Sequence, residues 1–148
     1  MTTPAKLKFT IYQGATFSER WQRLLCDYEI ELRNGVLVSK TTGAPVPDAD
    51  LTPEDYTGCT ARLQARPEIG SPYVLFELTT ENGGISLDAE GNVQIDQSAA
   101  QTALMKYGID PVNGSWTDCI GQMEVVRPSG AVDRQYEITF ILSQEGTV

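Results

Sequence analysis

The chain has 148 residues, of which 41% are hydrophobic and 21% charged, a composition typical of one globular domain spanning residues 1–148. Eleven basic and twenty acidic residues give a net charge of −9, which argues against nucleic-acid and anionic-membrane partners, because both rely on clustered Lys and Arg. The absence of histidine excludes Ser-His-Asp and Cys-His catalysis and histidine-ligated zinc.

The first predicted strand covers residues 6–12, where apolar and polar residues alternate with a period of two. Its two lysines suit an exposed sheet edge, because they keep such a strand from pairing with another copy. A second run, residues 16–25, alternates imperfectly and predicts a strand with a bulge. No apolar segment follows the N-terminal lysines, and none approaches the roughly 20 residues of a membrane span, so we expect neither a signal peptide nor a membrane partner.

Asn34-Gly35 predicts a tight hairpin over about residues 29–40, because both residues tolerate the positive φ of a type I′ turn. A two-residue loop places Leu32 opposite Leu37 and Ile30 opposite Ser39. The apolar side chains of this hairpin are Ile30, Leu32 and Leu37 on one face and Val36 and Val38 on the other.

The hairpin lies within a proline-rich and acid-rich segment, about residues 24–55, that we interpret as an insertion. A two-stranded hairpin is marginal alone in water, and two apolar faces need cover. One face can be covered by the domain, and the other then needs a neighbouring subunit. The five apolar residues of the hairpin are therefore candidate partner contacts. The alternative is that the hairpin simply extends one of the sheets of the domain.

The remainder of the chain also alternates as strands separated by turns. A short helix is predicted over about residues 98–107, with Ser98 as N-cap, Gln101 completing a capping box and Gly108 ending the helix. The predicted strands are residues 56–66, 73–79, 85–87, 93–95, 119–126 and 132–142. The pattern predicts an all-β fold, a β-sandwich (immunoglobulin-like or a related barrel) of about eight or nine strands.

Three groups of residues are candidate sites of chemistry. The acidic loop of Asp48, Asp50, Glu54 and Asp55 could ligate Ca²⁺ but lacks EF-hand spacing, which favours a solvated loop. Three cysteines without CxxC spacing favour reduced thiols, two or more of them packed as small apolar residues. Aromatic residues that could form a sugar platform are scattered over several strands, which favours core or rim positions: Trp21, Trp116, Tyr28, Tyr73 and Tyr136. We therefore predict no catalytic residue, metal, cofactor or small-molecule substrate.

Four segments resemble, in order and spacing, a family of small proteins encoded in the structural gene clusters of tailed phages and prophages. The segments are residues 10–17 (TIYQGATF), 56–66 (YTGCTARLQAR), 78–85 (LTTENGGI), which is followed by 91–93 (GNV) and 102–104 (TAL), and 123–132 (MEVVRPSGAV). The resemblance covers most of the chain. It departs in residues 24–55, which are longer than the short link usual there, and in residues 109–116, which are extended after the helix.

The resemblance implies the N-terminal β-sandwich of baseplate and tail proteins that carry receptor-binding fibres, with no catalytic residue. The expected function is a structural tail, baseplate or collar adaptor, made in the bacterial host cytoplasm and located in the virion. Its expected partners are tail, collar or fibre subunits, with several copies in a ring. The alternatives are a head decoration or head–tail joining protein and, from another class, a carbohydrate-binding or carbohydrate-hydrolysing module.

Overall fold

The computed structural model describes residues 4–145 and shows an all-β fold with one short α-helix, as the sequence predicts. The strands and helices are β1 (Ala5–Tyr12), β2 (Phe17–Gln22), β3 (Leu24–Leu25), β4 (Ile30–Arg33), β5 (Val36–Ser39), η1 (Asp48–Asp50), β6 (Thr52–Pro53), β7 (Thr60–Arg66), β8 (Phe76–Thr79), β9 (Ile85–Leu87), β10 (Asn92–Gln97), α1 (Ala99–Ala103), β11 (Lys106–Tyr107), η2 (Pro111–Asn113), β12 (Ser115–Trp116), β13 (Asp118–Val126) and β14 (Val132–Ser143).

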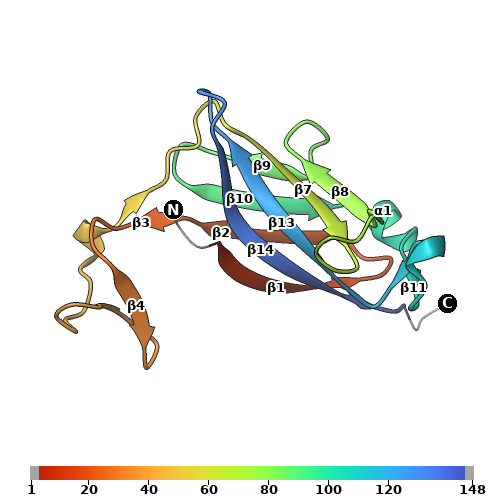
Figure 1. The fold of residues 1–148 in the computed structure, drawn as a ribbon, viewed down its shortest axis with the longest axis horizontal. Coiled ribbons are helices and arrows are strands. Elements are labelled where there is room, and N and C mark those ends of the chain that lie inside the picture. Colours follow the sequence, from red (N-terminus) through yellow and green to blue (C-terminus); the bar gives the residue numbers. More distant parts are fainter. Residues whose placement is uncertain (1–3, 146–148) are drawn as a thin grey trace.

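Two sheets make up the larger part of the molecule (Figure 1). The five-stranded sheet has the order β1-β14-β13-β7-β8, and the three-stranded sheet has the order β2-β10-β9. Strand β1 pairs parallel to β14 along its whole length, whereas the other pairs in these two sheets are antiparallel. Because β1 has a neighbour on one side alone, the expectation that residues 6–12 form a sheet edge is confirmed.

Aromatic side chains join the two sheets across the core. Phe9 of β1 stacks on Trp21 of β2 with ring centroids 5.6 Å apart, and Trp21 also meets Tyr136 of β14 at 5.2 Å. Phe17 of β2 meets Phe140 of β14 edge-on at 6.1 Å. These contacts bury the inner faces of both sheets, and inward-facing residues of β7, β8, β9, β10 and β13 contribute to the remainder of the core.

The predicted alternation holds best where a strand is central. In β7, Ala61, Leu63 and Ala65 are all buried and the residues between them point outward, as expected. The second run is instead divided at Arg23, whose backbone bonds to Gly91 and Glu54 rather than continuing the β2 ladder. More strands are present among the described residues than the eight or nine expected, because two-residue strands leave no alternation in a sequence.

The helix begins where predicted and ends earlier. Ser98 and Gln101 form the predicted capping box, but α1 stops at Ala103 instead of continuing to residue 107. The side chain that α1 buries is Thr102, whose hydroxyl donates to the carbonyl of Ala15 at 2.7 Å, and no apolar stripe packs against the core. The chain beyond it turns into β11, which pairs with β12, so Gly108 does not end the helix.

Candidate functional site

The described residues outside 24–53 form the body of the molecule. Residues 24–53 form an arm that projects from one end of the body (Figure 1). Strands β3 and β6 pair to make a stalk, with Leu25 opposite Thr52. Beyond the stalk, β4 and β5 form a two-stranded sheet of their own, so the alternative that the hairpin extends a sheet of the domain is wrong. No member of the buried core cluster comes from the arm, and the body is therefore packed without it.

The hairpin has the register that Asn34-Gly35 predicts. Leu32 pairs with Leu37 and Ile30 with Ser39, and Asn34 and Gly35 have φ values of 51° and 79°. Both turn residues thus lie in the left-handed region that a type I′ turn requires.

The two faces of the hairpin differ in their cover. Val38 is 7% exposed, because a strap of residues 44–46 folds back along β5 and places Pro45 opposite Val38. The strap is fixed by hydrogen bonds from Ser39 N–H to the Ala44 carbonyl at 2.9 Å and from Val46 N–H to the Leu37 carbonyl at 3.0 Å. Val38 is therefore not an available contact, and its cover comes from the arm itself rather than from the domain, which corrects the expectation.

The remaining predicted contacts stay accessible. Leu32 is 68% exposed, Val36 and Leu37 are also exposed, and Ile30 is half-buried. Exposed apolar side chains also lie on the stalk, at Leu24 and Leu25. The arm thus carries several exposed large apolar side chains on its stalk and hairpin, which is typical of a protein–protein contact surface.

The root of the arm is held by buried polar groups that the sequence did not indicate. Glu54 is 5% exposed and forms an ion pair with Arg127, which also lies 3.4 Å from Asp133. Tyr56 is buried beside this pair and donates its hydroxyl to Gln135 at 2.6 Å. The ion pair of Glu54 with Arg127 therefore fixes the chain to the body where the arm ends.

The acidic residues weighed as Ca²⁺ ligands point to different partners. Asp50 accepts a hydrogen bond from the Tyr28 hydroxyl at 2.5 Å, which raises the pKa of Tyr28 above its usual range. Asp55 accepts from the backbone and hydroxyl of Thr57, which lowers the pKa of its carboxyl, and Glu54 faces Arg127. Within residues 4–145, no three acidic or cysteine side chains gather closely enough to hold a metal ion.

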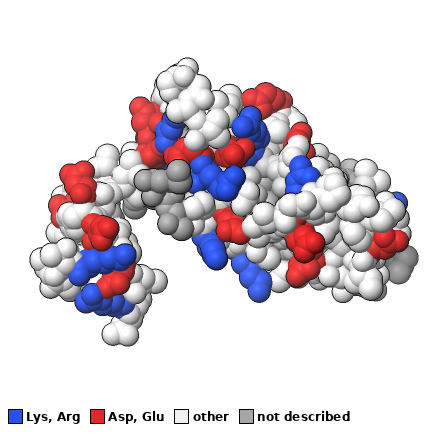
Figure 2. Space-filling model, viewed as in Figure 1, with Lys and Arg blue, Asp and Glu red and all other residues white. Residues whose placement is uncertain are grey.

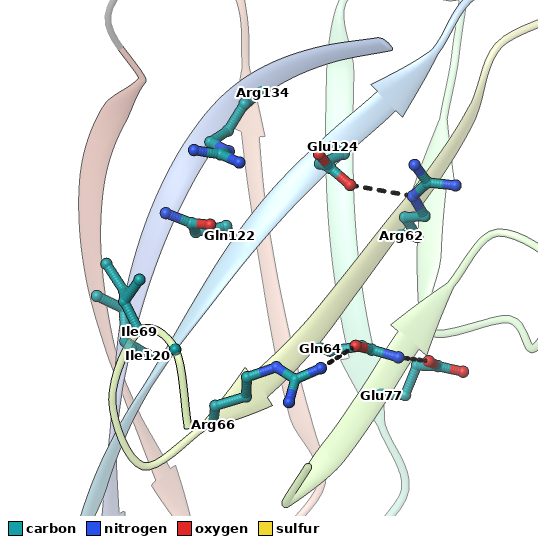
Figure 3. A pocket seen from close by; sticks show the side chains of 10 residues that line it. Arg62, Gln64, Arg66, Ile69, Glu77, Ile120, Gln122, Glu124 and Arg134 are labelled. Carbon is teal, nitrogen blue, oxygen red and sulfur yellow. Dashed lines mark hydrogen bonds and ion pairs between the residues drawn. The ribbon is translucent and has the colours of Figure 1, made fainter. Parts of the chain in front are cut away.

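A polar groove lies on the outer face of the five-stranded sheet (Figure 3). It encloses about 430 Å³ and is open to solvent, and Figure 2 shows basic and acidic side chains intermixed over this face. Arg62 bonds to Glu124 at 3.1 Å, and Arg66 bonds to Gln64 at 2.6 Å. The Arg134 side chain, in contrast, has no hydrogen-bond or ion-pair partner among the described residues, although its backbone pairs with Glu124 in the sheet. The groove is suited to hydrogen-bonding with a polar surface, because amide, guanidinium and carboxylate groups line it.

The aromatic residues and cysteines are arranged for packing. Trp116 and Tyr136 are buried, and Trp21 packs between Phe9 and Tyr136, so these three rings do not share an exposed platform with Tyr28 and Tyr73. Of the three free thiols, Cys119 is buried, and burial raises its pKa well above the usual range.

No protein-family model and no curated protein sequence matches the chain. No helix within residues 4–145 is both long and apolar enough to cross a membrane. The site that the geometry itself distinguishes is the arm, a projecting element with exposed apolar side chains and a fixed root.

Proposed function

We propose that the chain is a non-enzymatic structural component of a tailed-phage virion, a tail, baseplate or collar adaptor that joins a receptor-binding fibre to the particle. The observation that carries this proposal is the arm. It projects from the body, contributes nothing to the core and exposes Leu32, Leu37 and Val36. A surface of this kind is stabilised when a neighbouring subunit covers it.

The arm can supply part of the energy of one subunit contact. Removing a leucine or valine side chain from water contributes roughly 1.5–3 kcal/mol. Leu32 and Leu37 share one face and are 68% and 39% exposed, so covering both in one contact contributes roughly 1.5–3 kcal/mol in total, which fits a weak interface that forms within a multi-copy assembly. The ion pair of Glu54 with Arg127 fixes the chain where the arm leaves the body, so less orientational freedom is lost on binding.

The resemblance of four sequence segments to phage structural proteins supports the same function, and the two long sheets supply a rigid support for the arm. The two carboxylates of the groove, Glu77 and Glu124, accept hydrogen bonds from Gln64 and Arg62, respectively, and the Cys119 thiol is buried, which favours binding over hydrolysis.

The test is a variant that lacks the arm but keeps its stalk. Replacing residues 26–51 with Asn-Gly joins Leu25 to Thr52 through a two-residue turn, which suits the antiparallel pair that these residues already form. The shortened chain should unfold in one cooperative transition, because the core cluster is untouched. In a host that makes the shortened chain and no wild-type chain, the shortened chain should be absent from purified particles.

A finer pair of variants separates contact from folding. Leu32→Ser with Leu37→Ser changes exposed arm positions and should reduce incorporation into particles at least tenfold. Val132→Ser changes an exposed valine on the body and should leave incorporation unchanged. Full incorporation of the arm-free chain would contradict the proposal, whereas location of the wild-type chain at the head would favour the decoration or joining role.

A further inference from the structure

The outer edge of β4 has unpaired backbone groups. On β5, Ser39 N–H and the Leu37 carbonyl bond to the strap, on the side away from β4. On the side toward β4, Lys40 N–H donates to the Glu29 carbonyl. Because backbone groups alternate in direction along a strand, Glu31 and Arg33 face β5, and Ile30 and Leu32 direct their N–H and C=O groups outward. No other described segment pairs with this edge.

The charges on β4 distinguish this edge from that of β1. Lys6 and Lys8 on β1 carry the same charge and oppose self-pairing. On β4, Glu31 and Arg33 carry opposite charges, lie on one face and already form an ion pair. An edge with alternating opposite charges is compatible with an antiparallel copy of itself.

We infer that β4 pairs antiparallel with β4 of a second copy of this chain, which joins two hairpins into one four-stranded sheet. The pairing is centred on Leu32, whose outward N–H and C=O meet those of Leu32 in the second copy. Each Glu31 then lies opposite Arg33 of the other copy, and both pairs are within the usual 4.5–5.5 Å between Cβ atoms. This inference rests on the proposed role of the arm as a contact element.

The same charges select the register. Moving the centre by one residue along β4 places Glu31 opposite Glu31, or Arg33 opposite Arg33, and like charges directly opposite are destabilising. The arm extends away from the body, and its β4-β5 sheet is separate from the two large sheets (Figure 1). Because β4 is four residues long, the interface is small, and the dimer should be weak outside an assembly.

The test is sedimentation equilibrium of the purified full chain at protein concentrations of about 0.1–1 mM, the range in which so small an interface should associate. The wild-type chain should show a reversible monomer–dimer equilibrium. Glu31→Arg alone and Arg33→Glu alone each place like charges opposite one another and should weaken the dimer about tenfold. An equal mixture of the two variants should restore it as a heterodimer, because every cross-strand pair is again of opposite charge.

A backbone variant completes the test. Leu32→Pro removes an N–H that points outward and takes no part in the β4–β5 ladder, so the hairpin should persist and the dimer should be lost. A wild-type chain that stays monomeric at about 1 mM, or a mixture of charge variants that fails to associate, overturns the inference. A monomeric chain that still enters particles overturns this pairing while leaving the proposed function standing, because the arm-free variant tests that function separately.

Discussion

Loss of Arg127 should destabilise the chain far more than loss of its partner Glu54. Replacing Arg127 with Met leaves the Glu54 carboxylate without a cation, and the Glu54 side chain is only 7% exposed. Removing one member of a buried ion pair costs about 3–5 kcal/mol. Because the Arg127 side chain is 28% exposed, we expect the lower end of that range, about 3 kcal/mol.

Glu54→Gln should cost less, about 1 kcal/mol, because Arg127 keeps contact with solvent and with Asp133. The double variant should recover most of the loss seen with Arg127→Met alone, because a neutral amide tolerates burial without a cation. Arg62→Met is the matched control, since its partner Glu124 is more exposed than Glu54, and the change should cost less than about 1 kcal/mol.

The assay is urea unfolding followed by circular dichroism, with thermal unfolding as a second measurement. A loss of about 3 kcal/mol should lower Tm by roughly 6–12 °C in a chain of this size. A loss below about 1 kcal/mol for Arg127→Met, or strictly additive effects in the double variant, would show that Glu54 is not held by this pair and would refute the reasoning.

Three further changes test other parts of the structure. Thr102→Val removes the hydroxyl that bonds to Ala15 and should cost about 1–3 kcal/mol in urea unfolding, whereas Thr42→Val on the exposed arm should cost less than about 0.5 kcal/mol. Gly35→Ala, at a φ of 79°, should speed amide hydrogen exchange in the hairpin and leave the Tm of the body unchanged, and a lower body Tm would contradict the independence of the arm. Burial raises the pKa of Cys119, so above about pH 8.5 the folded chain keeps a proton that the unfolded chain releases. The free energy of unfolding should therefore fall as the pH rises past that value, and it should fall less in Cys119→Ala. Urea unfolding at pH 7 and 9.5 measures the difference.

The parts of the fold that sequence predicts are those set by neighbouring residues. Asn34-Gly35 fixes both the turn type and the register of its hairpin, because the two strands are joined by the residues that determine them. The Ser98 capping box likewise depends on a bond to a residue three positions away. The end of the helix was mispredicted because Lys106 and Tyr107 pair with β12, a contact made through tertiary structure.

The parts that could not be predicted depend on residues far apart in the chain. Glu54 and Arg127 are separated by 73 positions, and no local pattern shows that they meet. The groove gathers Arg62, Arg66 and Arg134 from two strands of one sheet, which requires the strand order to be known. The sequence predicts exposed apolar side chains on the arm, and Val38 is the exception, because residues 44–46 cover it. Those three residues have no strand-like alternation that would indicate this pairing.

The parallel pairing of β1 with β14 has a consequence for the order of folding. Ala5 is paired with Tyr136, so β1 cannot pair until a strand more than a hundred residues later has been synthesised. Ile138, Phe140 and Leu142 of that late strand also fill the centre of the core. The arm hairpin, with its two-residue loop, can form within microseconds of emerging from the ribosome, whereas the body must await β14. The formation of the arm hairpin therefore depends on residues close together in the chain, whereas the closure of the core depends on the last strand to be synthesised.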